Sequence, residues 1–249
     1  LSTLPEDVDG IICYPVDGDA NSQAFLDLAN SGYPLVLLDR APRGCEHLVV
    51  QTDNFRASEL AVTDLMDRGH RRIAFFGSSN DRAQSVRERF LGYRKTVESL
   101  DYDTRAYERW IPLLLEESSE LMYQTISDGF AVMRGLPEPP TAAFCIQDRL
   151  ASGVLDACQT YGLEVGIDFG VATFNDFGPS FFRYPQRIDR VVQRMEEVSE
   201  TAISRLRALI RGEDPGAGPV RIDAQFFPAE DPRKILTSSL YAHAAAGPP

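Results

Sequence analysis

The segment from Gly69 to Gly77 constrains the fold of this chain most, because it joins the end of a helix to a buried strand. Gly69 suits the left-handed position that follows a helix. The apolar run from Ile73 to Phe76 is typical of a parallel strand covered on both faces. A polar loop then leads into a helix that carries Arg89. Open α/β sheets bind ligands at loops of this kind, which leave the carboxyl ends of strands.

The rest of the chain repeats this alternation. Short apolar runs predict strands, and apolar residues spaced by three and four predict helices. Strands are predicted at 8–13, 35–38, 48–50, 73–76, 141–146, 169–174, 187–192 and 219–227. Helices are predicted at 20–31, 55–68, 88–99, 118–134, 149–161 and 196–211. This order predicts an α/β fold with parallel sheets and helices on both faces.

The composition is typical of a globular protein, but the charge is strongly acidic. Of 249 residues, 43% are hydrophobic and 25% are charged, and the net charge is −12. Long-range repulsion would oppose the approach of such a surface to phosphate backbones or anionic membranes. No apolar run is long enough to span a bilayer, and there is no signal peptide. We therefore expect a chain that binds neither DNA nor membrane by itself.

Cysteines and histidines give no sign of a metal or catalytic centre. Cys13, Cys45, Cys145 and Cys158 form no C-x-x-C pair, so we expect free thiols, as in the reducing cytoplasm. His70 follows a helix end, where an imidazolium would meet the negative end of the helix dipole. Phosphate-binding, nucleophile-elbow and zinc-protease motifs are absent. The sequence therefore predicts no enzyme, no metal and no cofactor.

Several motifs together resemble the effector-binding core of the lactose/galactose-repressor family of bacterial transcription regulators. In family order they are Val8–Ile12, Pro34–Arg40, Thr52–Asn54, Gly69–Ala74, Arg89–Tyr93, Pro140–Phe144, Asp148 with Ala151–Gly153, and Val171–Asp176. The resemblance implies two Rossmann-like lobes like those of type I periplasmic binding proteins, with a small molecule between them. It implies a first lobe of 1–53 and 190–213, and a second lobe of 54–189 and 214–237. A flexible tail is expected over 238–249.

Two parts of the family pattern have no counterpart in this chain. They are the N-terminal helix-turn-helix and the first β-α-β portion of the first lobe. A sheet without its first two strands would expose an apolar edge. We therefore expect the chain to be a fragment, or to lack residues before Leu1.

The resemblance and the residues themselves together predict seven ligand-binding residues, which are Arg89, Asn175, Gln147, Trp110, Ser85, Phe144 and Asp39. Arg89 matches the family arginine after the opening strand, and its planar fork of donors can hold hydroxyl pairs or a carboxylate. The alternatives are a solvated charge or an ion pair with Glu88 or Asp101, and Arg87 is the rival for the role.

Asn175 and Gln147 each follow a predicted strand. Many family members carry an acid at the first position and an asparagine at the second. The Asn175 amide can donate to and accept from a sugar hydroxyl, although asparagine is also common in turns. The longer Gln147 side chain would shorten the pocket or shift the ligand. Asp148 is expected to be the N-cap of the helix over 149–161.

The remaining four residues each keep two interpretations. Trp110 can stack on a sugar face or pack in a core. Phe144 has the same alternatives, and its apolar strand favours the core. Ser85 is expected in the loop before Arg89, as a hydroxyl contact or a plain loop serine. Asp39 could reach the ligand across the cleft or pair with Arg40.

The family function follows from these expectations. The chain would sense a sugar-like effector in the bacterial cytoplasm, form a homodimer, and reach operator DNA only through a helix-turn-helix outside this sequence. The effector would shift the population of lobe arrangements and so change operator affinity. The alternatives are a solute-binding protein of a transport system and a hydrolase or nucleosidase that acts on a sugar-like ligand.

Overall fold

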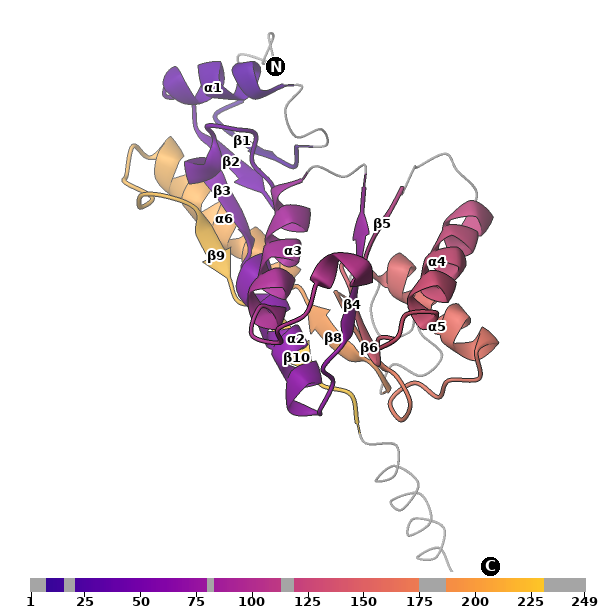
Figure 1. Ribbon diagram of the computed structural model, residues 1–249. Helices are drawn as coiled ribbons and strands as arrows, with labels where there is room; N and C mark the ends of the chain where they lie inside the picture. The colour runs from indigo at the N-terminus through magenta and orange to yellow at the C-terminus, as the bar shows by residue number, and fades with distance from the viewer. Residues whose placement is uncertain (1–7, 16–20, 80–82, 113–118, 175–186, 231–249) are drawn as a thin grey trace, which may run out of the picture.

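The computed structural model describes residues 8–15, 21–79, 83–112, 119–174 and 187–230, which form two sheets flanked by helices (Figure 1). One sheet has the strand order β1-β2-β3-β9, and the other has the order β10-β8-β7-β6-β4-β5. Every strand pair is parallel except β10 with β8, which is antiparallel. The predicted α/β class with parallel sheets is confirmed.

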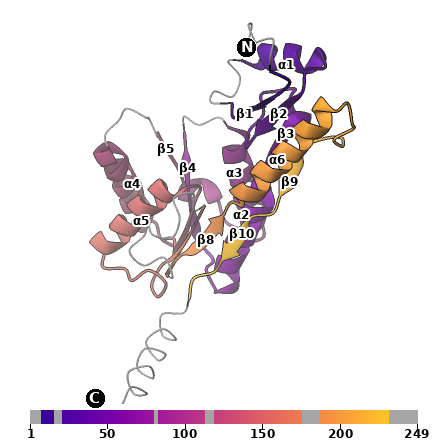
Figure 2. The ribbon, with the colours of Figure 1, turned by 180° about the vertical axis from the view of Figure 1, so that it is seen from behind.

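The first lobe is the four-stranded sheet between two helices, as Figures 1 and 2 show from opposite sides. Its elements are β1 (Ile11–Cys13), α1 (Ser22–Asn30), β2 (Leu35–Leu38), a 3-10 turn (Glu46–Leu48), β3 (Val49–Thr52), α6 (Met195–Ile210) and β9 (Val220–Ile222). Side chains alternate between the faces of the sheet. Leu35 and Leu37 pack with Phe25 of α1, whereas Val36 and Val50 pack with α6.

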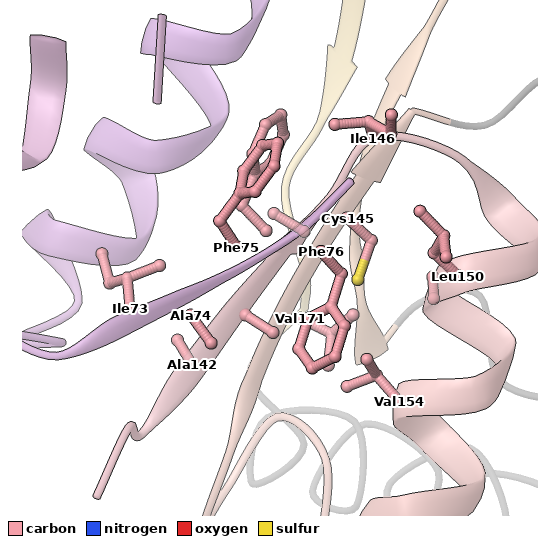
Figure 3. Close-up of a cluster of buried hydrophobic side chains, with 14 of the residues drawn as sticks. Ile73, Ala74, Phe75, Phe76, Ala142, Cys145, Ile146, Leu150, Val154 and Val171 are labelled. Carbon is pink, nitrogen blue, oxygen red and sulfur yellow. The ribbon is translucent and has the colours of Figure 1, made fainter. Parts of the chain in front are cut away.

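The second lobe is the six-stranded sheet with two helices on each face. Its elements are α2 (Asn54–Asp67), β4 (Ile73–Ser78), α3 (Gln84–Val97), a 3-10 turn (Thr104–Tyr107), β5 (Glu108–Ile111), α4 (Ser119–Arg134), β6 (Ala142–Cys145), α5 (Asp148–Thr160), β7 (Gly170–Phe174), β8 (Asp189–Val192) and β10 (Gln225–Phe227). Phe75 and Phe76 of β4 are fully buried. Figure 3 shows the Phe76 side chain on the face of the sheet that α5 covers, beside Val154.

Helix α2 begins and ends as its sequence predicts. Asp53 is the N-cap, and its carboxylate accepts from the Arg56 backbone N–H at 3.0 Å. Gly69 has φ of 97° after the helix end, a conformation that costs glycine little. Helices α2 and α3 pack unusually closely at Gly92. A Cβ there would overlap the carbonyl oxygen of Phe55 and lie 2.8 Å from Cβ of Ser58.

The prediction of α3 and that of the strand over 219–227 were wrong in extent, and strand β5 was not predicted. Helix α3 begins at Gln84, not at 88, because its polar first turn lacks apolar spacing and its N-cap is Ala83, which has no capping side chain. Strand β5 was missed because only Trp110 and Ile111 of its residues are apolar, as befits an edge strand. The strand predicted over 219–227 is two strands in different sheets.

The chain crosses between the lobes at three places: between β3 and α2, between β8 and α6, and between β9 and β10. The lobe limits expected over the last two crossings were therefore misplaced. Residues 190–192 of β8 lie in the second sheet, and β9 lies in the first. The crossings are bonded together, since Asp53 N–H donates to Ile222 O at 2.8 Å and the Thr52 hydroxyl donates to Gln193 Oε1 at 2.9 Å.

Candidate functional site

The candidate site lies at the carboxyl ends of β6 and β7, where α3 brings Arg89 over the sheet. Parallel strands end at one edge, which is where open α/β sheets bind ligands. Arg89 is in the second turn of α3, not at its start as expected, and only 7% of it is exposed. Burying a guanidinium is costly unless it is hydrogen-bonded. Its partners therefore decide what this residue does.

Arg89 is held by contacts from α2, β7 and the segment between β6 and α5. Its Nε donates to Asn54 Oδ1 at 2.8 Å, and its Nη1 donates to the Ile146 carbonyl oxygen at 2.7 Å. Its guanidinium carbon lies 3.7 Å from the centre of the Phe174 ring, a cation–π contact. These contacts differ from the alternative of an ion pair between Arg89 and Glu88 or Asp101. The arginine is fixed in orientation at the strand ends.

Asn54 and Phe174 complete this arrangement, and sequence reasoning missed both roles. Asn54 is fully buried at the start of α2, and its Nδ2 donates to the Thr52 carbonyl oxygen at 3.0 Å. An asparagine at the start of a helix is usually interpreted as a cap, because its side chain accepts backbone N–H bonds. The available signal was positional, because Phe174 closes a strand and Asn54 opens a helix, both at the ligand edge of the sheet.

Ser85 precedes Arg89 on α3, and Gln147 follows Ile146, whose carbonyl oxygen accepts from Arg89. Ser85 lies in α3 rather than in a loop, four residues before Arg89 and so on the same helix face, and it is buried. Gln147 is the half-buried N-cap residue of α5 and makes no side-chain cap bond. Asp148 is therefore not the N-cap. It is the first residue of α5 and is fully buried.

Phe144 is fully buried in β6, and its ring lies 6.4 Å from Tyr93 and 6.2 Å from Phe174 between ring centres. This is the core alternative that its apolar strand favoured. The Phe144 ring therefore packs against the Phe174 ring, which in turn contacts Arg89. The expected ligand residue Asn175 lies outside the described residues.

Trp110 lies apart from Arg89, in the edge strand β5. Trp110 is 40% exposed, and its indole contacts Phe75 and Phe90, with ring centres 5.1 Å and 4.9 Å away. It borders a hollow of about 380 Å³, lined also by Ser78, Ser79, Ala83, Val86, Arg87 and Phe90. Arg87 is exposed, so of the two rival arginines only Arg89 points to the strand ends.

Asp39 closes β2 on the first-lobe side. Its φ of 64° is a conformation that side chains other than glycine rarely adopt. Its Oδ2 accepts from Arg40 Nε at 3.4 Å, which is the ion-pair alternative. A strained, buried carboxylate at a strand end is a feature that functional sites often contain.

Two ionisable side chains at the opposite end of the second sheet have shifted pKa values. Burial, helped by Arg68 and Arg71, lowers the pKa of His70 to about 4. His70 is therefore neutral at pH 7, which corrects the expected imidazolium, and its Nδ1 lies 3.0 Å from Thr141 Oγ1. Burial raises the pKa of Asp189 to about 6, against the opposing effect of its ion pair with Arg68.

Two further features, a cluster of metal ligands and a membrane-spanning helix, can be looked for in the described part of the chain. Among those residues no group of three or more His, Cys, Asp and Glu side chains could hold a metal ion. No described helix is long and apolar enough to cross a bilayer. The site at the strand ends therefore offers a guanidinium, amides, hydroxyls and an aromatic face, which suit a polar organic molecule.

A model of the periplasmic binding protein-like domain matches residues 62–227, more than half of the chain. The chain belongs to this family. Among curated relatives, the HTH-type transcriptional regulator GntR of Escherichia coli (strain K12) is 29% identical over 85% of this chain and 60% of its own length. ExuR of Bacillus subtilis (strain 168), named a probable HTH-type transcriptional repressor, is 27% identical over 95% of this chain and 68% of its own length.

Solved structures agree on the fold. A LacI-family sugar-binding transcriptional regulator from Escherichia coli, complexed with phosphate, has a TM-score of 0.72 at 20% identity and covers 90% of this chain and 76% of that chain. The CelR–cellobiose complex has a TM-score of 0.71 at 21% identity, with 91% and 66% covered. The predicted resemblance to lactose/galactose-type repressors is confirmed, and the curated relatives favour a regulator over a transport protein. This chain spans about two thirds of their length.

Proposed function

We propose that this chain is the effector-binding core of a bacterial transcriptional regulator, with a sugar-like small molecule held between its lobes. The observation that carries the proposal is Arg89, which is buried at the strand ends and fixed by Asn54, the Ile146 carbonyl and the Phe174 ring. A guanidinium already oriented loses little freedom when it binds hydroxyls or a carboxylate. The regulator CelR, which shares this fold, was solved with cellobiose.

The other contacts of the effector follow from the placement of the strand ends. Ser85 shares a helix face with Arg89, and Gln147 follows the carbonyl that Arg89 bonds. Asn175 and, from the first lobe, Asp39 are the further contacts that we propose. Trp110 is three strands from Phe174 in the sheet, a span of roughly 14 Å at about 4.8 Å per strand. It would meet only a long ligand.

The remaining parts of the proposal are the partners. A homodimer would act in the bacterial cytoplasm, and operator DNA would be bound by a helix-turn-helix like that named in the relatives. The effector would leave chemically unchanged, because its role is to favour one lobe arrangement over another. An acidic core of net charge −12 suits this division, since it leaves phosphate contacts to a separate module.

A thermal-shift screen with a matched pair of arginine variants tests the proposal. Probes would be glucose, galactose, ribose, cellobiose, gluconate, glucuronate, sorbitol and adenine. A ligand at 100 times its Kd adds about 2.7 kcal/mol, so the wild type should gain several degrees in Tm. Arg89→Ala and Arg89→Lys should lose that gain. Arg87→Ala, two residues away on an exposed position, should keep it.

Two results would contradict the proposal. A full ligand response in both Arg89 variants would place the effector elsewhere. Conversion of the ligand into a product, seen by NMR after prolonged incubation, would revive the hydrolase alternative. Circular dichroism of each variant distinguishes lost binding from lost folding, because Arg89→Ala leaves Asn54 and the Ile146 carbonyl without this donor.

A further inference from the structure

Each of the three crossings between the lobes is linked by hydrogen bonds or an ion pair to Arg89 or to its neighbour Glu88. Asn54 accepts from Arg89 through Oδ1 and donates through Nδ2 to the Thr52 carbonyl oxygen. The Thr52 hydroxyl donates to Gln193, which follows β8. Two of the crossings are thus connected to Arg89 by contacts of 2.8 to 3.0 Å.

The third crossing is reached from the residue next to Arg89. The Glu88 carboxylate accepts from both terminal nitrogens of Arg221, with Oε1 2.8 Å from Nη2 and Oε2 3.1 Å from Nη1. Arg221 belongs to β9 of the first lobe, two residues before the chain passes into the second. Gln84 Nε2 donates to Glu88 Oε1 at 2.9 Å, which orients the carboxylate further. This is a bidentate ion pair between the lobes.

The pair is shielded from water more than a surface ion pair. The Glu88 side chain is 11% exposed and that of Arg221 is 36% exposed. Charge pairs held in a fixed fork and partly desolvated are stronger than solvated ones. Successive residues of a helix point about 100° apart, so α3 can direct Arg89 into the second lobe and Glu88 toward the first. One helix therefore contacts both the candidate site and the first lobe.

We propose that Glu88 and Arg221 form an inter-lobe latch that fixes the orientation of the first lobe relative to the wall that holds Arg89. The latch acts through α3, which the close approach at Gly92 couples to α2. Breaking it frees the crossings to open locally while both lobes stay folded. The latch needs no effector, so its test is independent of the proposed function.

The chain supplies a matched control for this ion pair. Arg56 of α2 and Asp223 of the β9–β10 crossing lie 3.9 Å apart and also connect the lobes. Their side chains are 73% and 66% exposed, so solvent screens the attraction and the pair contributes little. Arg56→Gln therefore removes the same charge as Arg221→Gln, and it does so near the same crossing without removing a buried contact.

Hydrogen exchange at the Asp53 amide measures the latch directly, because that N–H donates to Ile222 O across the crossing. The variants are Glu88→Gln, Arg221→Gln and the double variant, with Arg56→Gln as control. Each single variant should raise the Asp53 exchange rate roughly tenfold, and the double should exceed the faster single by about twofold or less. Arg56→Gln should leave the rate within about twofold of wild type. Amides of β6 report whether the second lobe stays folded.

Each other outcome would overturn the latch. Unchanged Asp53 exchange in both single variants would show that the pair carries no coupling. If the double variant raised the Asp53 exchange rate by the product of the two single increases, the two residues would act separately. Arg221 could then act through its 4.0 Å approach to Asp53. Equal acceleration of the β6 amides would mean that the pair supports the whole fold rather than the lobe orientation.

Discussion

The two lobes are built on the same plan of strands between helices, but their sheets are buried to different depths. Every residue of β4, β6 and β7 in the second lobe is buried. In the first lobe only β3 is buried throughout, and the edge strands β1 and β9 hold no buried residue. Since apolar burial is the main stabilising contribution, the second lobe should open less readily than the first. We therefore expect the lobe that holds Arg89 to be the more rigid of the two.

The largest expected effect comes from one substitution made in both lobes. Ile73 of β4 is fully buried and Ile12 of β1 is half-buried. Ile73→Ala should cost about 2–5 kcal/mol of unfolding free energy, because it leaves a cavity in the core. Ile12→Ala should cost about 1 kcal/mol or less. Urea unfolding measures both, and equal costs would show that the burial difference does not set stability.

A second prediction concerns pH and is confined to the second lobe. The pKa of His70 is lowered to about 4, so its contribution to stability is present above pH 6.5 and is lost as the pH falls toward 4. The pKa of Asp189 is raised to about 6, so its contribution is present below pH 3.8 and is lost as the pH rises toward 6. The two effects oppose each other between pH 4 and 6.

Single variants should reveal this opposition. Acidification from pH 7 to 4.5 should stabilise His70→Asn relative to wild type by roughly 1–2 kcal/mol, after allowance for the partial exposure of the imidazole. Asp189→Asn should lose stability relative to wild type by a similar amount over the same pH range. Urea midpoints at several pH values measure both. Parallel curves for wild type and both variants would contradict these pKa shifts.

The smallest predicted effect tests the junction between the lobes. Asp53→Ala removes the side-chain cap of α2 and should cost about 1 kcal/mol. Asp53→Asn preserves a capping acceptor and should cost much less. The second lobe should report the loss, since α2 covers its sheet. Thermal unfolding of the two variants provides the comparison, and identical Tm values would exclude the cap as a stabilising contact.

Local sequence signals predicted most of the fold, because helices and buried strands leave their spacing in the chain. The strand at 35–38 and the end of α2 at Gly69 illustrate this, since each depends on neighbouring residues alone. The start of α3 was missed because it does not depend on neighbouring residues alone. Ser85 and Arg89 are polar, and only packing against the rest of the lobe explains why both are buried.

The candidate site shows a sharper limit. The resemblance to the repressor family was enough to name Arg89 and Gln147 as candidates, and their roles stay predictions. It was not enough to select Asn54, which is 35 residues from Arg89 in sequence and meets it only in the folded chain. The same limit explains the misplaced lobe crossings, because β9 and β10 are separated by two residues that carry no sign of a change of sheet.

The close approach of α2 and α3 at Gly92 restricts how this protein could be given a new ligand preference. A half-buried residue such as Gln147, which makes no side-chain cap bond, is open to randomisation in a library. Any side chain at Gly92 would push the helix that carries Arg89 away from its neighbour. Library design should therefore keep position 92 fixed, because a substitution there would displace the arginine and alter recognition of every candidate ligand at once.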